Sequence, residues 1–310
     1  MPKVVAFGGG HGLAVTLTAL RKVRAEITAI VTVADNGGSS GRLREEFPIF
    51  PPGDLRMALA ALCADDEWGR TWAKIMQHRF ESAGELNGHA MGNLLLASMW
   101  NAGDDPVAAL DRVGELLKVV GRVLPMAAVA LDIEGTFNTS TGRIVVRGQK
   151  EVATAKGEIE SLRIIPNDPT ARPEALTAIA QAQWITMGPG SWFSSVIPHL
   201  LVPAQLVALE SAEAKKVLIL NLDASPNLQG EEFAGSSPEQ HLEFFHRYAP
   251  GLRVDYCLVD QSVVRNRQAL DQAAATLGGE IVVADVRKAP GSIHHDSEKL
   301  ALHLGHIFSQ

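Results

Sequence analysis

Cysteine is scarce in this sequence, which has two cysteines, Cys63 and Cys257, among 310 residues. Both lie in apolar surroundings, far apart in the chain, and without the short spacing that metal ligands show. This pattern excludes a disulfide-based scaffold and a cysteine metal site. It predicts two buried free thiols in a reducing cytoplasm.

Long hydrophobic runs are lacking as well. The most apolar windows, residues 57–64 and 200–209, are too short for a membrane span or are interrupted by Pro203. Met1 leads almost directly into an apolar strand, without the basic segment and long apolar segment of a signal peptide. We therefore expect a cytoplasmic protein with no membrane span.

Dense clusters of lysine and arginine are missing too. The chain has 28 basic and 35 acidic residues, and its net charge is −7. With no RNA-binding signature either, we expect no nucleic-acid partner. The remaining composition, 46% apolar and 20% charged, is that of an ordinary globular protein. A chain of this length builds its core without disulfides or structural metals.

Apolar strands alternate with helical stretches along most of the chain, which predicts a parallel sheet covered by helices on both faces. We expect strands at residues 3–7, 27–33, 184–187, 217–222, 256–260 and 280–284. We expect helices beginning at Leu13 and over residues 53–64, 67–78, 89–100, 106–119, 172–182, 193–199, 238–248, 268–277 and 297–307. The sequence predicts a single Rossmann-like α/β domain over residues 1–310, a three-layer parallel sheet.

One segment differs from this alternation. Residues 123–165 carry short strand patterns at 127–133, 143–147 and 161–165, separated by glycine turns. Such a pattern is typical of hairpins rather than of βαβ units. We expect a small β-rich insertion at about residues 123–165.

A glycine-rich loop follows the first strand directly. Its residues are Gly8, Gly9, Gly10, His11 and Gly12. Glycines let a backbone approach a ligand closely, and free N–H groups at a helix start favour an anion, most often a phosphate. Leu13 or Val15 stands where G-x-G-x-x-G requires its third glycine, which disfavours NAD and FAD. The alternative interpretation is a tight strand-to-helix turn.

A second loop follows the second strand. It contains Asp35, Asn36, Gly37, Gly38, Ser39, Ser40 and Arg42. Its serines can donate hydrogen bonds, and Arg42 can clamp a phosphate through two parallel bonds. Asp35 could hold a ribose hydroxyl, or Mg²⁺ through water. The alternative is an Asx-turn at Asp35 and Asn36 with Ser40 as a helix N-cap.

Further candidates lie at turns and helix starts along the chain. They are Gly53, Asp54, Arg56, Asn87, His89, Asn93, Gly188, Pro189, Gly190, Ser191, Asn221 and His294. His89 and Asn93 are four residues apart, so we expect them to share a helix face. For Asp54, satisfying the N–H groups of a helix start is an alternative role. For His294, His295 and Asp296, the alternative interpretation is a loop followed by the N-cap of the last helix.

These motifs together resemble a known family. Residues 8–13, 31–44, 51–56, 87–93 and 188–191 occur in the order seen in the gluconeogenesis factor (YvcK-like) family, which is similar in fold to 2-phospho-L-lactate transferase (CofD). The resemblance implies a cytoplasmic bacterial protein that binds a UDP-sugar, notably UDP-N-acetylglucosamine. It also implies roles in growth on gluconeogenic carbon sources, cell shape and peptidoglycan synthesis, with no settled catalytic activity.

The sequence departs from that family pattern at four places. His11 replaces a frequent threonine, and Asn36 replaces a second aspartate, which removes one charged oxygen from a Mg²⁺ site. The run from Asp223 to Gly235 is longer and keeps only Gly230 and Glu231. His294 stands where relatives carry an arginine that helps to bind the UDP-sugar, and a neutral imidazole contacts a diphosphate less strongly.

The leading hypothesis is therefore a regulatory protein that binds a nucleotide sugar, with a cell-wall or regulatory protein as partner and a homodimer as a possible assembly. It requires no cofactor, although Mg²⁺ could bind near Asp35 or Asp54. The second hypothesis is a transferase of the phospholactate type, in which Arg42, Arg56 and Mg²⁺ neutralise charge. A third, an NAD(P)-dependent oxidoreductase, is disfavoured by the missing glycine.

Overall fold

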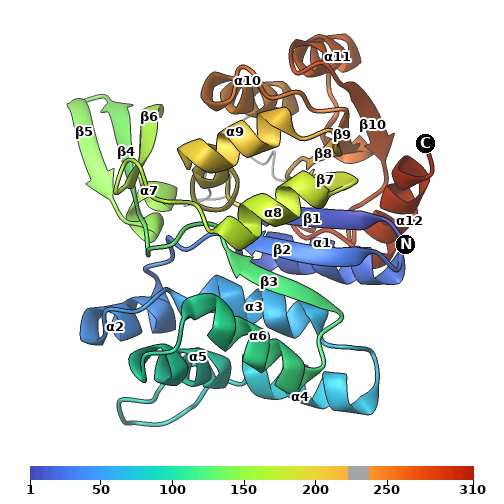
Figure 1. The fold of residues 1–310 in the computed structure, drawn as a ribbon. Coiled ribbons are helices and arrows are strands. Elements are labelled where there is room, and N and C mark those ends of the chain that lie inside the picture. The colour runs from blue at the N-terminus through green and yellow to red at the C-terminus, as the bar shows by residue number, and fades with distance from the viewer. Residues whose placement is uncertain (223–236) are drawn as a thin grey trace.

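A computed structural model describes residues 1–222 and 237–310 of the chain. Within them, a seven-stranded parallel sheet forms the middle layer (Figure 1). Its strands are β1 (Lys3–Gly8), β2 (Glu26–Val31), β3 (Gly121–Pro125), β7 (Trp184–Met187), β8 (Lys215–Ile219), β9 (Tyr256–Asp260) and β10 (Glu280–Ala284). Most strand residues are buried, as expected where helices cover both faces. The predicted Rossmann-like fold is confirmed.

The order of the strands is β10-β9-β8-β7-β1-β2-β3. From β1 the chain moves outward through β2 to β3, whereas from β7 it moves in the opposite direction through β8 and β9 to β10. Because parallel crossovers are right-handed, the two halves place their helices on opposite faces. The reversal between β1 and β7 is a topological switch point, where sheets of this kind bind ligands.

Helices cover both faces of the sheet. One face carries α1 (Gly10–Lys22), α3 (Pro52–Leu62) and α12 (Ser297–Phe308), and the other carries α8 (Pro173–Gln181), α9 (Pro203–Ser211), α10 (Pro238–Tyr248) and α11 (Arg267–Thr276). The remaining helices are α2 (Gly38–Glu46), α4 (Glu67–Gln77), α5 (Met91–Asn101), α6 (Pro106–Leu117) and α7 (Gln149–Thr154). Short turns η1 (Trp192–Val196), η2 (Ile197–Leu200) and η3 (Gln261–Val263) complete the described elements.

The insertion is a three-stranded antiparallel sheet beside the main sheet (Figure 1). It consists of β4 (Asp132–Thr139), β5 (Gly142–Arg147) and β6 (Glu158–Ile165), with β4 in the centre. The predicted β-rich character is confirmed, but the strand expected at 127–133 is wrong, since β4 begins at Asp132. Residues 121–125 form β3 and pair with β2 in the large sheet.

Several other boundaries differ from the sequence-based expectation. Helix α1 begins at Gly10 rather than Leu13, β2 ends at Val31 and β8 ends at Ile219. The helix expected over 193–199 is a π turn followed by a 3₁₀ turn, and α9 was not expected. The capping box at Ser237 and Gln240 is present, and Cys63 and Cys257 are buried free thiols.

Among the described residues, no single helix is long and apolar enough to cross a membrane. Residues Trp192–Leu200 and Pro203–Ser211 reach the required length and hydropathy only as a pair, and that pair is bent by 73°.

Candidate functional site

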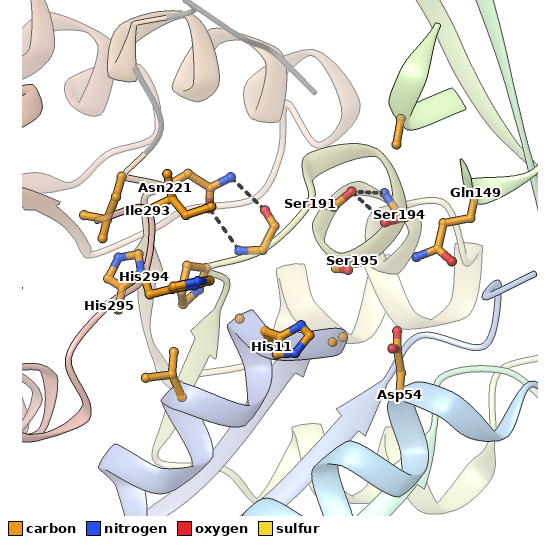
Figure 2. Close-up of a pocket in the computed structure, with 18 of the residues that line it drawn as sticks. His11, Asp54, Gln149, Ser191, Ser194, Ser195, Asn221, Ile293, His294 and His295 are labelled. Atoms are coloured by element: carbon orange, nitrogen blue, oxygen red, sulfur yellow. Dashed lines mark hydrogen bonds between the residues drawn. The ribbon is translucent and has the colours of Figure 1, made fainter. Parts of the chain in front are cut away.

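A cavity of about 450 Å³ lies at the switch point of the sheet (Figure 2). The segments that follow β1, β7, β8 and β10 form most of its wall, and α3, α7 and α10 contribute the rest. The predicted site residues that line it are Gly9, Gly10, His11, Gly12, Asp54, Pro189, Gly190, Ser191, Asn221 and His294. Residues from five distant parts of the sequence therefore meet at one place.

The other predicted site residues are outside the described cavity lining. They are Gly8, Asp35, Asn36, Gly37, Gly38, Ser39, Ser40, Arg42, Gly53, Arg56, Asn87, His89, Asn93 and Gly188. Most of the second glycine-rich segment is thus next to the cavity wall rather than part of it. The run from Asp223 to Gly235, where the sequence departs from the family pattern, lies outside the described residues.

Sequence reasoning missed nine of the residues that line the cavity. They are Val15, Gln149, Ala153, Ser194, Ser195, Leu222, His241, Ile293 and His295. Ser194 carried a usable signal, because it is the third residue after Ser191, the spacing of an N-cap contact. Gln149 and Ala153 carried none, since α7 reaches the cavity only through the packing of the insertion.

The glycine loop that follows β1 touches the glycine loop that follows β7. A Cβ atom placed on Gly12 would lie 2.0 Å from the carbonyl oxygen of Pro189. Asn221 holds the loop that follows β7. Its Oδ1 accepts from the N–H of Gly190 and its Nδ2 donates to the carbonyl of Gly190, both at 2.9 Å (Figure 2). The absence of a side chain at Gly12 is therefore a requirement of the fold at this point.

Ser191 begins the turn that follows β7. Its Oγ accepts hydrogen bonds from the N–H of Ser194 at 3.0 Å and from the Oγ of Ser194 at 2.6 Å (Figure 2). This N-cap ends the loop and turns two further serines toward the cavity. The wall on this side thus offers hydroxyl groups without any charged side chain.

Asp54 is the carboxylate of the cavity. It is buried at the start of α3, and its Oδ2 has no hydrogen-bond partner among the described residues. Burial, and then repulsion from Asp35, raise the pKa of Asp54 to about 7, against the opposing effects of the Gly10 N–H and the Arg56 guanidinium. The carboxyl group therefore exchanges its proton near neutral pH.

Asp35 and Asp54 are the residues that could hold a divalent cation. A free carboxylate oxygen beside a second carboxylate suits Mg²⁺, and a cation would relieve the repulsion that raises the pKa of Asp54. The described residues contain no group of three carboxylate, histidine or cysteine side chains placed to bind a metal. Bound Mg²⁺ would have to complete its coordination with water or a ligand.

Ser39, Arg56, His89 and Asn93 form one buried network beside the cavity. Arg56 Nε donates to Asn93 Oδ1 at 2.8 Å, and Asn93 Nδ2 donates to Ser39 Oγ at 3.0 Å. Ser39 Oγ also hydrogen-bonds to His89 Nδ1, at 3.0 Å. Burial lowers the pKa of His89. The network fixes α3 against α2 and α5.

The shared helix face predicted for His89 and Asn93 is wrong, because α5 begins only at Met91. The two side chains are nevertheless brought together, by Ser39. The hydrogen bond of Met91 N–H to the carbonyl of His78 and that of His89 N–H to the carbonyl of Leu86 hold the preceding turn in place. Tertiary contacts thus replace the helical spacing.

Arg42 differs from its predicted role as a phosphate clamp. Its guanidinium donates to the carbonyls of Asn87 at 2.7 Å and Glu85 at 3.3 Å, which ties α2 to the turn before α5. The predicted Asx-turn is present, with the Gly37 N–H donating to Asp35 Oδ1 at 2.8 Å. The N-cap of α2 is Gly37 rather than Ser40, and Ser40 Oγ accepts from Gly53 N–H instead.

Two histidines at the cavity wall come from opposite ends of the chain. His11 lies in the first turn of α1, and His294 lies in the segment before α12 (Figure 2). Burial, and then His294, Arg56 and Arg79, lower the pKa of His11. Nearby His295 is buried, and its Nε2 lies 3.2 Å from the carbonyl of Leu220; burial lowers the pKa of His295 to about 4.

Residues 4–296 match the family model described as 2-phospho-L-lactate transferase CofD. The chain belongs to the CofD family. A relative from Mycobacterium leprae (strain TN) is 49% identical over 310 residues, which are 98% of this chain and 85% of the relative. The gluconeogenesis factor of Halalkalibacterium halodurans is 37% identical over 291 residues, covering 92% of this chain and 85% of that protein.

Solved structures agree with this family assignment. The crystal structure of a member of the UPF0052 family from Bacillus halodurans is similar with a TM-score of 0.85 and 33% identity, covering 98% of this chain and 99% of that one. The resemblance to gluconeogenesis factors and to the CofD fold, predicted from the sequence, is confirmed.

Proposed function

We propose that the protein binds a nucleotide sugar of the UDP-N-acetylglucosamine type and acts as a gluconeogenesis factor that links carbon supply to cell shape and peptidoglycan synthesis. The observation that carries the proposal is the position of the cavity. It lies at the reversal of strand order, between the glycine loops that follow β1 and β7, the location at which α/β sheets bind nucleotides.

The cavity has features suited to such a ligand. Its volume, about 450 Å³, is in the range of small-molecule sites. Gly9 and Gly10 open α1, where backbone N–H groups and the helix dipole favour a phosphate. Ser191, Ser194 and Asn221 add polar groups that could orient a sugar or a base.

A second function, group transfer of the phospholactate type, is favoured by one observation. The Asp54 carboxyl, with its free Oδ2 and its neighbour Asp35, could hold Mg²⁺ against a diphosphate. Arg56 would add positive charge from beside the wall. Such an enzyme works mainly by positioning its substrates and neutralising their charge, and it needs an acceptor as well as a nucleotide-linked donor.

A thermal-shift titration separates these functions. The purified protein is titrated with UDP-N-acetylglucosamine, UDP-glucose, GDP, GTP and NAD, each with and without Mg²⁺. A ligand at about 100 times its Kd adds about 2.7 kcal/mol to the free energy of unfolding, a shift of several degrees. The proposal predicts a shift selective for UDP-sugars. A Mg²⁺-dependent shift with guanine nucleotides would favour the transferase, and no shift with any nucleotide would reject both.

A further inference from the structure

The described wall of the cavity contains histidines and one carboxylate, but neither lysine nor arginine. A nucleotide diphosphate brings two negative charges into this partly enclosed space. Such charges are costly to desolvate unless positive groups compensate them. Backbone N–H groups supply partial charges only. A full positive charge on the described wall can therefore come only from protonation of an imidazole.

The histidines of the wall are not equivalent. The ring of His241 packs against Trp192, with centroids 5.1 Å apart, and His295 is buried against the carbonyl of Leu220. His11 and His294 remain, one on α1 and one on the segment before α12 (Figure 2). They are close enough for the charge of His294 to disfavour a charge on His11.

Positively charged side chains lie near His11. Arg56 on α3 and Arg79 on the segment before α5 also disfavour protonation of His11. Asp54 on α3 is the carboxylate of the wall, and His295 is the other titratable neighbour of His294. In the free protein, burial, His294 and these two arginines lower the pKa of His11. An anion placed between His11 and His294 would reverse that balance, because it favours the charged form of both rings.

We propose that the cavity takes up its anionic ligand together with protons, which bind to His11 and His294 when a diphosphate lies between them. This inference rests on the proposed function, since it concerns the same cavity. Linkage then requires the affinity to rise as the pH falls. Each proton taken up changes the Kd by about tenfold per pH unit, and each ring contributes up to one proton.

Isothermal titration calorimetry tests the proposal on the whole protein, with UDP-N-acetylglucosamine at pH 8.0 and pH 7.0 and with divalent cations removed. Each phosphate of this probe carries one ester bond and shares the anhydride bond between the two, so the probe lacks the terminal phosphate monoester group that titrates near pH 6. Running each pH in two buffers of different ionisation enthalpy counts the protons taken up. We expect the Kd to fall about tenfold from pH 8.0 to pH 7.0, with uptake of about one proton or more.

Variants assign the protons to residues. His11→Asn and His294→Asn should each lower the uptake, and the double variant should abolish it. His294→Arg should bind at pH 8.0 at least as tightly as the native protein, with a weaker dependence on pH. The control is His303→Asn, which changes a histidine of α12 outside the cavity lining and should leave both the Kd and the proton count unchanged.

The possible failures are distinguishable. Binding whose Kd is the same at both pH values would overturn the proton uptake and leave the proposed function standing. Uptake that persists in the double variant would also overturn it, since the proton would then belong to Asp54 or another group. Absence of binding by the native protein at either pH would reject the proposed function, and this inference with it.

Discussion

Gly12 is the residue at which the glycine loop after β1 meets the glycine loop after β7. A methyl group at this position would overlap the backbone carbonyl of Pro189, at 2.0 Å, and a backbone atom cannot move aside as a flexible side chain can. Gly12→Ala should therefore lower the free energy of unfolding by about 1–3 kcal/mol and weaken ligand-induced stabilisation. Urea unfolding, followed by fluorescence of the five tryptophans, measures the first effect.

Gly84 provides the matched control for this substitution. A Cβ atom placed on Gly84 would meet nothing within 4 Å, and the residue is exposed. Gly84→Ala should change stability by no more than about 0.5 kcal/mol. Equal stability of the two alanine variants would show that the loops do not depend on their close contact.

At the scale of single residues, the sequence predicts turns better than contacts. Gly9, Gly12 and Gly190 were identifiable because glycines clustered at strand ends have few other uses. The partners of Arg42 were not, because its bonds to the carbonyls of Glu85 and Asn87 depend on how α2 packs. An arginine that hydrogen-bonds to backbone carbonyls cannot be distinguished by sequence alone from an arginine that binds a phosphate.

Tyr248, at the end of α10, makes one of the contacts between the insertion and the main body. Its hydroxyl accepts a hydrogen bond from the backbone N–H of Leu162 in β6, at 2.6 Å, and its ring packs against Phe244. Tyr248→Phe removes the acceptor and keeps the ring. We expect a loss of about 1 kcal/mol and faster amide hydrogen exchange in β6, with the large sheet unaffected.

Tyr256, the other tyrosine of the chain, is the control for this change. It lies in β9 of the large sheet, so Tyr256→Phe should leave exchange in β6 at the native rate. Unchanged exchange at Leu162 in the Tyr248 variant would mean that this hydrogen bond does not hold the insertion in place. Because Gln149 and Ala153 of the insertion line the cavity, the result also bears on how that wall is held.

Elements with strong periodicity were predictable, and those that depend on partners were not. No strand was expected at residues 121–125, and residues 123–125 were counted in the insertion, because the sequence does not reveal the pairing with β2 that places them in the large sheet. The first residues of helix α2 were expected as a loop, with a helix N-cap at Ser40 as the alternative, since glycines and serines have low helix propensity. Buried contacts of Ser39, Ser40 and Leu43 stabilise it instead.

At the scale of the whole molecule, alternation predicted a parallel sheet but not the order of its strands. The site depends on that order, because the cavity lies where β1 meets β7, two strands about 180 residues apart in the chain. Both glycine loops were recognised as ligand-binding candidates from the sequence. That the loop after β7, rather than the one after β2, faces the first loop across the cavity is a property of the assembled sheet.

The stability of the whole molecule should depend on pH, and three buried groups with large pKa shifts contribute to this dependence. Burial lowers the pKa of His199 to about 4, and that of His295 to about 4, from an ordinary value near 6.5. Below pH 6.5 the unfolded chain binds these two protons and the folded protein does not, so acid favours unfolding. Asp54 acts in the opposite direction: its pKa is about 7 in the folded protein and 3.8 as a model value, so the folded protein binds its proton first.

As the pH falls, the unfolded chain takes up two protons on the histidines, whereas the folded protein takes up one on Asp54. The net effect of these three groups is a loss of stability. Between about pH 6 and pH 4.5, these three groups together should decrease the free energy of unfolding by about 1.4 kcal/mol per pH unit, and the lowered pKa values of His11 and His89 act in the same direction. Asp54→Asn removes the opposing contribution, so this variant should lose about 2.7 kcal/mol per pH unit in the same interval and be more stable than the native protein at pH 8.

The control is Asp271→Asn, which breaks only the exposed ion pair with Arg267 and should follow the native profile. Urea unfolding at pH 8.0, 6.0, 5.25 and 4.5 measures all three profiles. Parallel profiles for the native protein and the Asp54 variant would show that Asp54 is ionised throughout this range, so that its burial is compensated more fully than its free Oδ2 indicates.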